Sequence, residues 1–130
     1  MIVVDASVLG NALVYADDRG LRARAALGRD PEWAAPEHWK AEVFSVLRGL
    51  TLGQKITSGV GQRGVGRIPR LGIDTVPLDD LLPRMWQIRE SINGYDAAYV
   101  ALAEARALTL VTADGKLAKA ATSYCRIELA

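Results

Sequence analysis

The chain has 130 residues, half of them hydrophobic, and its 16 Lys and Arg nearly balance its 15 Asp and Glu. This length predicts a single domain, residues 1–130, and the composition excludes a disordered chain or a strongly basic nucleic-acid coat protein. The single cysteine, Cys125, excludes an internal disulfide and favours a cytoplasmic location. We expect no signal peptide and no membrane segment, because Met1 runs directly into a strand and no apolar run reaches roughly 18 residues.

Hydrophobic periodicity predicts alternating strands and helices in the first half of the chain. Ile2–Val4 is typical of a buried strand, and the apolar residues that follow recur at the spacing of one helix face. Glycines 28 and 53 stand where a helix commonly ends. The expected elements are a strand at 2–4, helices at 6–16 and 19–28, a short strand at 32–36 and a helix at 38–53.

The same alternation continues after residue 70. The expected elements are a strand at 72–78, helices at 78–92 and 95–107, a strand at 108–114, a helix at 115–123 and a last strand at 125–129. Pro83 is compatible with its helix if it lies in the first turn. Strands that alternate with helices predict an α/β fold with a parallel sheet.

The segment "TSGVGQRGVGRIPR", residues 57–70, departs from this pattern. It has four glycines, each of which costs roughly 1 kcal/mol relative to Ala inside a helix. Three of them spell G-x-G-x-x-G, but a dinucleotide-binding loop must follow a strand, and here a helix precedes the motif. We therefore expect a frayed helix or a mobile loop with outward-pointing arginines.

Positive charge is concentrated around this segment. No acidic residue occurs between Glu42 and Asp74, whereas five basic residues do: Arg48, Lys55, Arg63, Arg67 and Arg70. Two interpretations remain open, a solvated basic face and a surface that contacts the phosphates of a nucleic acid.

Four carboxylates stand at the starts of predicted helices: Asp5, Glu42, Asp96 and Asp114. Each alone has a structural explanation, because Asp caps helix N-termini and Glu in a first turn complements the helix dipole. Asp5 and Asp114 also follow strands, and ligands of parallel sheets bind beyond the carboxyl ends of the strands. Whether Glu42 and Asp96 reach the same edge depends on where their helices begin.

Carboxylates gathered within a few ångströms would raise each other's pKa, unless a divalent cation neutralised them. Oxygen ligands alone suit Mg²⁺ or Mn²⁺. Zinc fits poorly, since the chain offers only His38 and Cys125 as softer ligands, and we expect His38 at the surface or at a helix start. Such a metal site indicates phosphoryl chemistry with an activated water.

Competing enzyme classes match the sequence less well. A haloacid-dehalogenase-like phosphatase requires D-x-D after the first strand, but position 7 is Ser. A response-regulator receiver requires an acidic pair there, whereas Asp5 stands alone. A different kind of protein also remains open: a non-catalytic dimerisation and partner-binding module, in which the four acids only cap helices.

Three stretches, "IVVDASVL", "AEVFSVLRG" and "YDAAYVALAEARALTLVTADGKLAKAA", resemble the PIN-domain ribonucleases, in particular VapC-type toxins. The likeness covers essentially the whole chain. It implies a three-layer α/β/α domain with a central, mostly parallel sheet of four to five strands, in the order 3-2-1-4-5. In this family the segment 57–70 is usually a regular helix, so its glycines are a departure.

The resemblance also implies the function and its residues. The protein is expected to be an endoribonuclease toxin that uses Mg²⁺ or Mn²⁺, forms a homodimer and is blocked by a cognate antitoxin. The family's catalytic, metal-binding acids fall on Asp5, Glu42, Asp96 and Asp114, of which Asp5 and Asp96 are the surest ligands. Ser7 and Thr112 match supporting hydroxyl positions, although both also suit local hydrogen bonding to the turns. Arg48, Arg63 and Arg67 are weaker candidates for RNA contact.

Overall fold

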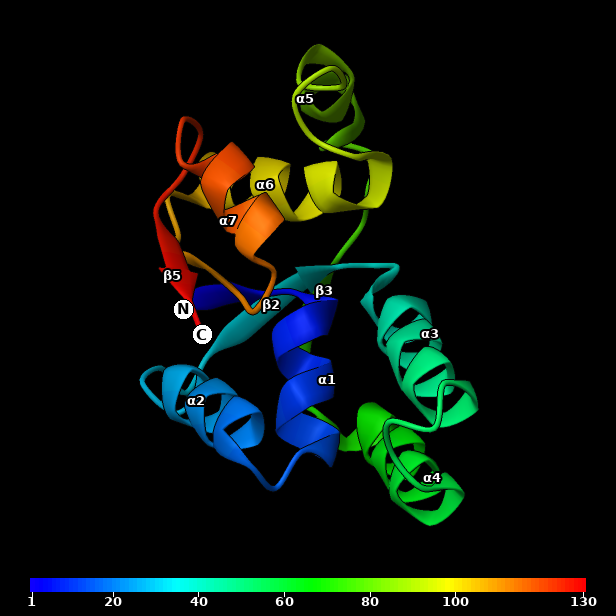
Figure 1. Cartoon of the computed structure of the whole chain (residues 1–130). Helices are drawn as coiled ribbons and strands as arrows, with labels where there is room; N and C mark the ends of the chain where they lie inside the picture. Colours follow the sequence, from blue (N-terminus) through cyan, green and yellow to red (C-terminus); the bar gives the residue numbers. More distant parts are fainter.

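Five short strands form one sheet, in which every pair of neighbours is parallel. The computed structural model describes residues 1–130 (Figure 1). The strands are β1 (Ile2–Val4), β2 (Trp33–Pro36), β3 (Ile73–Val76), β4 (Leu110–Thr112) and β5 (Ile127–Leu129). Their order is β3-β2-β1-β4-β5. The α/β class and the predicted order 3-2-1-4-5 are both confirmed.

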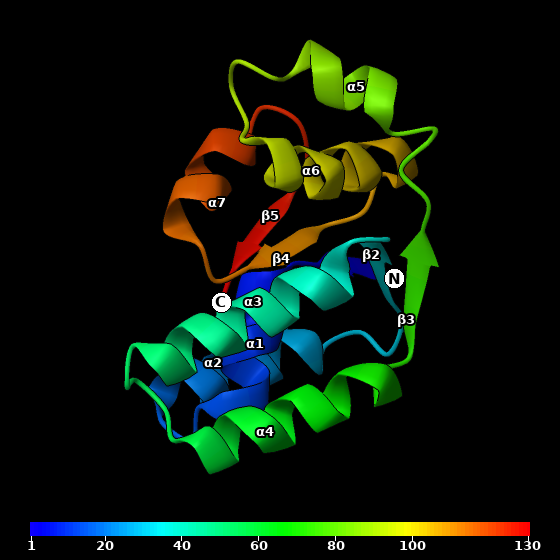
Figure 2. The same cartoon turned by 90° about the vertical axis from the view of Figure 1, so that its right-hand side faces the viewer.

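Helices cover both faces of the sheet, which gives the expected three layers (Figures 1 and 2). One layer has α1 (Ala6–Val14), α2 (Asp18–Leu27), α3 (Trp39–Leu52) and α4 (Ser58–Arg67), which a short 3₁₀ turn, Ile68–Arg70, follows. The other layer has α5 (Leu82–Gln87), α6 (Gly94–Arg106) and α7 (Gly115–Ala121). None of these helices has the length and apolar character needed to cross a bilayer.

The core is centred on β1, β4 and α6. Val3, Val4, Leu110 and Val111 are completely buried, because both faces of the central strands are covered. Residues 97–103 of α6 are all buried as well, since α6 packs on the sheet and is covered by α5. The two central strands and α6 therefore provide a rigid support for any residue at their ends.

The glycine-rich segment is a helix, so the expectation of a frayed helix or mobile loop is wrong. Thr57 caps α4 by accepting a hydrogen bond from the Val60 N–H, at 3.2 Å. A Cβ at Gly61 would collide with Thr51 Oγ1 of α3, and one at Gly64 would lie 2.9 Å from Leu47 Cδ1. These glycines allow close contact between α4 and α3, and that packing offsets their low helix propensity. The arginines of the glycine-rich segment are exposed, as predicted.

The helix expected at 78–92 is shorter, because only Leu82–Gln87 are helical. Pro83 does lie in its first turn, where its missing N–H leaves no hydrogen bond unmade. The residues on either side form turns whose buried members, Leu81, Ile88 and Ile92, pack on the core. The apolar spacing therefore reflected burial over a longer stretch than the helix itself.

Candidate active site

Asp5 and Asp114 lie at the carboxyl edge of the sheet, on the two neighbouring strands β1 and β4. Asp5 follows β1 directly and Asp114 follows β4 after one residue. Both also cap helices: Asp5 Oδ1 accepts a hydrogen bond from the Val8 N–H (3.1 Å), and Asp114 Oδ1 accepts one from the Lys116 N–H (2.9 Å). Capping and a place in a common site are therefore compatible, because a carboxylate retains further acceptor positions.

Glu42 and Asp96 reach the same edge from the first turns of α3 and α6. These two helices belong to opposite layers, but both begin on the right-hand side of Figure 1. The pKa of Asp96 is raised to about 6, chiefly by burial and then by the negative charges of Asp5, Glu42 and Asp114. This mutual influence requires the four carboxylates to lie close together. The tertiary structure thus brings Glu42 and Asp96 to the edge of the sheet that carries Asp5 and Asp114, which the sequence had left open.

The Asp5 carboxylate is held by hydroxyl groups from both strand ends. It is 4% exposed, and it accepts hydrogen bonds from Ser7 Oγ (2.7 Å) and Thr112 Oγ1 (2.5 Å). Those hydroxyls accept hydrogen bonds in turn from the N–H groups of Ala113 (2.9 Å) and Asp114 (3.0 Å). Burial raises the pKa of Asp5 despite these hydrogen bonds. Ser7 and Thr112 therefore serve the turn backbone and Asp5 at once.

Buried Tyr99 and half-buried His38 also lie at the site, and sequence analysis assigned neither of them to it. His38 is at the N-cap position of α3, as expected for a helix start, but its ring points inward rather than lying at the surface. The His38 ring is 5.3 Å from that of Tyr99, centroid to centroid, and Nε2 is 2.7 Å from Glu42 Oε1. Sequence spacing could have indicated both residues, because residues three or four apart share a helix face. His38 is four residues before Glu42, and Tyr99 is three residues after Asp96.

Several polar atoms here have no properly aligned hydrogen-bond partner: both ring nitrogens of His38, Glu42 Oε1 and the Tyr99 hydroxyl. Burial, followed by the negative charge of Glu42, raises the pKa of Tyr99. Unsatisfied buried groups are uncommon in folded proteins and indicate a ligand or a catalytic role. Glu42 Oε1 lies 2.7 Å from His38 Nε2, and the Glu42 carboxylate keeps further acceptor positions for a cation or a water.

The donor set suits a hard cation, although the side chains do not form a closed cage. No group of three His, Cys, Asp or Glu side chains is arranged to hold a metal ion. Mg²⁺ typically uses only one or two protein carboxylates and completes its octahedron with waters and substrate phosphate. The clustered carboxylates therefore fit Mg²⁺ or Mn²⁺ better than zinc.

The arginines proposed for RNA contact lie away from these acids. Arg48 lines a groove between α3 and α4, whereas Arg63 and Arg67 line another beside α1. Neither groove includes an acid of the cluster. Lys116, which the sequence analysis did not single out as a binding residue, lines a cavity together with Asp96 and Asp114.

Comparisons with known proteins agree with this architecture. The family model described as "PIN domain" matches residues 2–122. The chain is 37% identical to ribonuclease VapC9 of Mycobacterium tuberculosis over 127 residues, or 98% of this chain and 96% of the relative. It is 34% identical to ribonuclease VapC3 of the same organism over 119 residues, or 92% and 86%.

A solved structure is similar in fold. The crystal structure of Mycobacterium tuberculosis VapC20, described as a toxin that cleaves the sarcin–ricin loop, superposes with a TM-score of 0.69. The match covers 92% of this chain and 95% of VapC20 at 16% sequence identity. The architecture therefore persists where the two sequences have diverged widely.

Proposed function

Because the chain belongs to the PIN-domain family, we propose that it is a metal-dependent endoribonuclease that acts as the toxin of a toxin–antitoxin pair. Relatives that are 33–37% identical over nearly the whole chain are named VapC ribonucleases. The observation that carries the proposal is the gathering of the acids at one edge of the sheet: Glu42 and Asp96 line one cavity, Asp96 and Asp114 line the next, and the Thr112 hydroxyl links Asp5 to the Asp114 backbone. Burial, and then the negative charges of Asp5, Glu42 and Asp114, raise the pKa of Asp96 to about 6. Four clustered carboxylates carry more negative charge than Lys116, the one lysine that lines these cavities, can balance, so a divalent cation would stabilise them.

Asp5 and Asp96 would hold the divalent cation, and Asp114 and Glu42 would complete its surroundings. When bound, Mg²⁺ or Mn²⁺ lowers the pKa of a water and neutralises charge that develops on the phosphate. Ser7 and Thr112 keep the Asp5 carboxylate in one orientation through their hydrogen bonds. That orientation matters because catalysis of phosphoryl transfer depends largely on positioning and electrostatics.

Glu42 is suited to orient the attacking water. Its carboxylate has acceptor positions beyond the 2.7 Å contact of Oε1 with His38 Nε2, so it can accept a hydrogen bond, and then the proton, from that water. The water oxygen then forms a bond to phosphorus as the opposite ester bond breaks, in line, and the leaving ribose oxygen takes up a proton from solvent. This reaction needs neither a histidine nucleophile nor a serine triad.

We also propose the partners that this function requires. The substrate is RNA, and exposed Arg48, Arg63 and Arg67 contact its backbone at a distance from the site. A cognate antitoxin blocks the site, the active form is a homodimer, and the toxin acts in the cytoplasm as a single domain, residues 1–130. Charge reversal at Arg63 and Arg67 should weaken RNA binding and flatten its dependence on salt; unchanged binding would remove this surface from the proposal.

The central experiment uses purified, antitoxin-free protein and total bacterial RNA. We expect discrete cleavage with Mg²⁺ or Mn²⁺, none with EDTA, and none from Asp96→Asn. The fragment ends would identify the target. Cleavage that persists in EDTA, or in Asp96→Asn, would contradict the proposed mechanism.

A second function, a non-catalytic dimerisation and partner-binding module, is favoured by one observation: Asp5 and Asp114 do cap helices. A thermal-shift titration with Mn²⁺ separates the two functions. A metal site should raise the melting temperature by several degrees at saturating metal, because the ion binds only the folded state. Helix caps alone should leave it unchanged.

A further inference from the structure

A cavity opens on one side of the acidic cluster. Its volume is about 570 Å³, and it lies between the first turns of α3 and α6. Glu42 and Asp96 form part of its wall, and Leu78 and Met85 supply an apolar surface. Small-molecule sites have this character, about 300–1,000 Å³ of mainly apolar wall with a few polar groups.

Two aromatic rings line this cavity. Tyr95 is 73% exposed, an unusual state for a large aromatic side chain, and its ring centroid is 5.6 Å from that of His38. The two rings are inclined by 35°. The exposed face of Tyr95 is available for stacking. His38 Nδ1 has no hydrogen-bond partner, whereas Nε2 lies 2.7 Å from Glu42 Oε1. The cavity thus combines a flat apolar surface with an unpaired ring nitrogen.

A second cavity lies across Asp96 from the first and has a different chemistry. Its volume is about 250 Å³, and the two cavities share Asn93 and Asp96. It contains no aromatic residue, and its charged members besides Asp96 are Asp114 and Lys116. The acidic cluster therefore separates an aromatic cavity from one that offers a cation.

We propose that the aromatic cavity is a nucleobase-binding subsite, in which one base of single-stranded RNA stacks on Tyr95 and its polar edge contacts His38. Stacking of unpaired bases on aromatic side chains is the usual way in which proteins grip single-stranded RNA. The backbone next to that base then crosses Asp96, and Lys116 meets a phosphate on the far side. Tyr95 and His38 become determinants of where the RNA is cut.

This inference rests on the proposed ribonuclease function for its ligand, but its test does not depend on cleavage. The probe is a single-stranded hexaribonucleotide that contains one 2-aminopurine, titrated with the full chain in EDTA at low salt. Fluorescence of 2-aminopurine is quenched when the base stacks. We expect quenching with the wild type, for at least one position of the label.

Three variants make the test specific. Tyr95→Ala should lose the quenching and weaken binding about 5- to 150-fold, the range equivalent to the stacking of one base. Tyr95→Phe, which retains a ring, should behave as the wild type. Trp86→Ala removes an aromatic residue that is equally exposed, at 68%, but lines neither cavity, and it should change nothing. His38→Ala should keep the quenching but reduce the difference in affinity between A₆, C₆, G₆ and U₆.

The outcomes distinguish this inference from the nuclease proposal. Absence of quenching in the wild type, or equal quenching by Tyr95→Ala, would overturn the subsite even if the protein cuts RNA with Mn²⁺. Tyr95-dependent quenching by a protein that cuts no RNA would support the subsite and remove the nuclease. Loss of quenching in Trp86→Ala as well would show a general loss of fold or binding and would also overturn the assignment to this cavity.

Discussion

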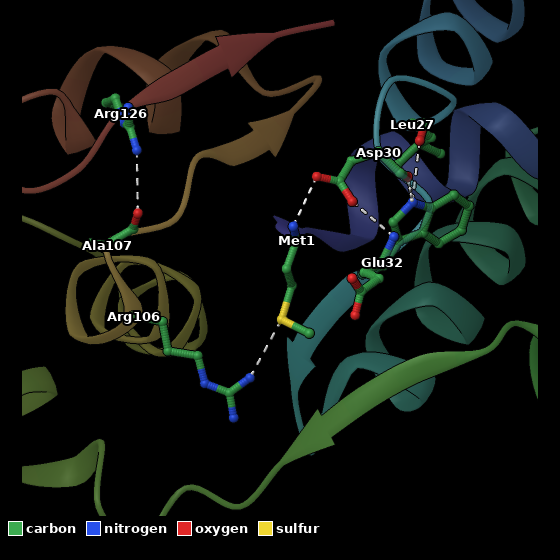
Figure 3. Close-up of polar contacts among 8 residues, drawn as sticks. Met1, Leu27, Asp30, Glu32, Arg106, Ala107 and Arg126 are labelled. Carbon is green, nitrogen blue, oxygen red and sulfur yellow. Dashed lines mark hydrogen bonds and ion pairs between the residues drawn. The ribbon is translucent and has the colours of Figure 1, made fainter.

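The two ends of the sheet handle negative charge in opposite ways. At the amino end two carboxylates pair with cations: the Met1 ammonium pairs with Asp30 at 2.8 Å, and Arg106 pairs with Asp74 at 3.0 Å. Figure 3 shows the Met1–Asp30 pair, with the Arg106 guanidinium beside the Met1 sulfur. The hydrogen bond from the ammonium holds the pKa of Asp30 below its ordinary value.

At the carboxyl end the acids face one another instead. The pKa of Asp96 is raised to about 6, and that of Asp5 is also raised. Polar groups differ in the same way. The Arg126 guanidinium donates to the Ala107 carbonyl oxygen (Figure 3). The indole N–H of Trp33 donates to the Asp30 carbonyl oxygen, whereas the Tyr99 hydroxyl has no hydrogen-bond partner. The comparison teaches that charges and polar groups are largely paired within the chain at one end, whereas at the other they leave the acidic cluster that we propose binds a cation.

The largest expected difference between the two ends is in activity. Asp5→Asn should reduce RNA cleavage at least about 100-fold, because metal binding supplies several kcal/mol of charge stabilisation in the transition state. Asp30→Asn, the same change at the other end, should leave cleavage within about twofold of wild type. Initial rates on one RNA with Mn²⁺ measure both, and similar losses in the two variants would refute the comparison.

A smaller loss is expected when the support of Asp5 is removed. Thr112→Val deletes the hydroxyl that donates to Asp5 while it keeps the shape of the buried side chain. Cleavage should fall about 10- to 100-fold, the usual effect of an outer-shell partner of a metal ligand. Thr122→Val makes the same change at an exposed position, so it is the matched control and should cleave RNA normally.

The carboxyl end should also govern the pH dependence of stability. The pKa of Asp96 is about 6 in the folded chain against an ordinary 3.8, so between these values the folded state holds a proton that the unfolded state has released. This contribution to stability is present at low pH and is lost as the pH rises through about 6. In EDTA, the melting temperature of the wild type should therefore fall more between about pH 5 and 7 than that of Asp96→Asn.

Mn²⁺ sharpens this pH test, because a cation binds the ionised carboxylates. The stabilisation by Mn²⁺ should grow over the same pH interval. Identical pH profiles for the wild type and Asp96→Asn would show that Asp96 does not titrate in this range.

The smallest effect is expected at the amino end. Arg106→Ala removes one partner of an exposed ion pair and should lower the free energy of unfolding by about 0.2–1 kcal/mol, less at high salt. Urea denaturation at two salt concentrations measures this change. A loss several times larger would mean that the pairs at this end support the fold more than surface ion pairs usually do.

Much of the fold was predictable, because its signals are local. β-branched runs marked the central strands, Asp5 and Asp114 stood at real helix starts, and Pro83 lay in a first turn. The segment 57–70 was predicted wrongly because glycine counts against a helix when its neighbours are unknown. Gly61 and Gly64 favour the helix only because α3 lies against them.

The sequence by itself determined where the candidate site residues stand along the chain: four acids at helix starts and two hydroxyls beside two of them. Only the tertiary structure decided that Asp96 and Glu42 join Asp5, that His38 turns inward, and that Tyr95 and Lys116 flank the cluster. Capping and strand formation depend on neighbours a few residues away. Burial, shifted pKa values and cavities depend on distances between residues far apart in the chain, which packing alone sets.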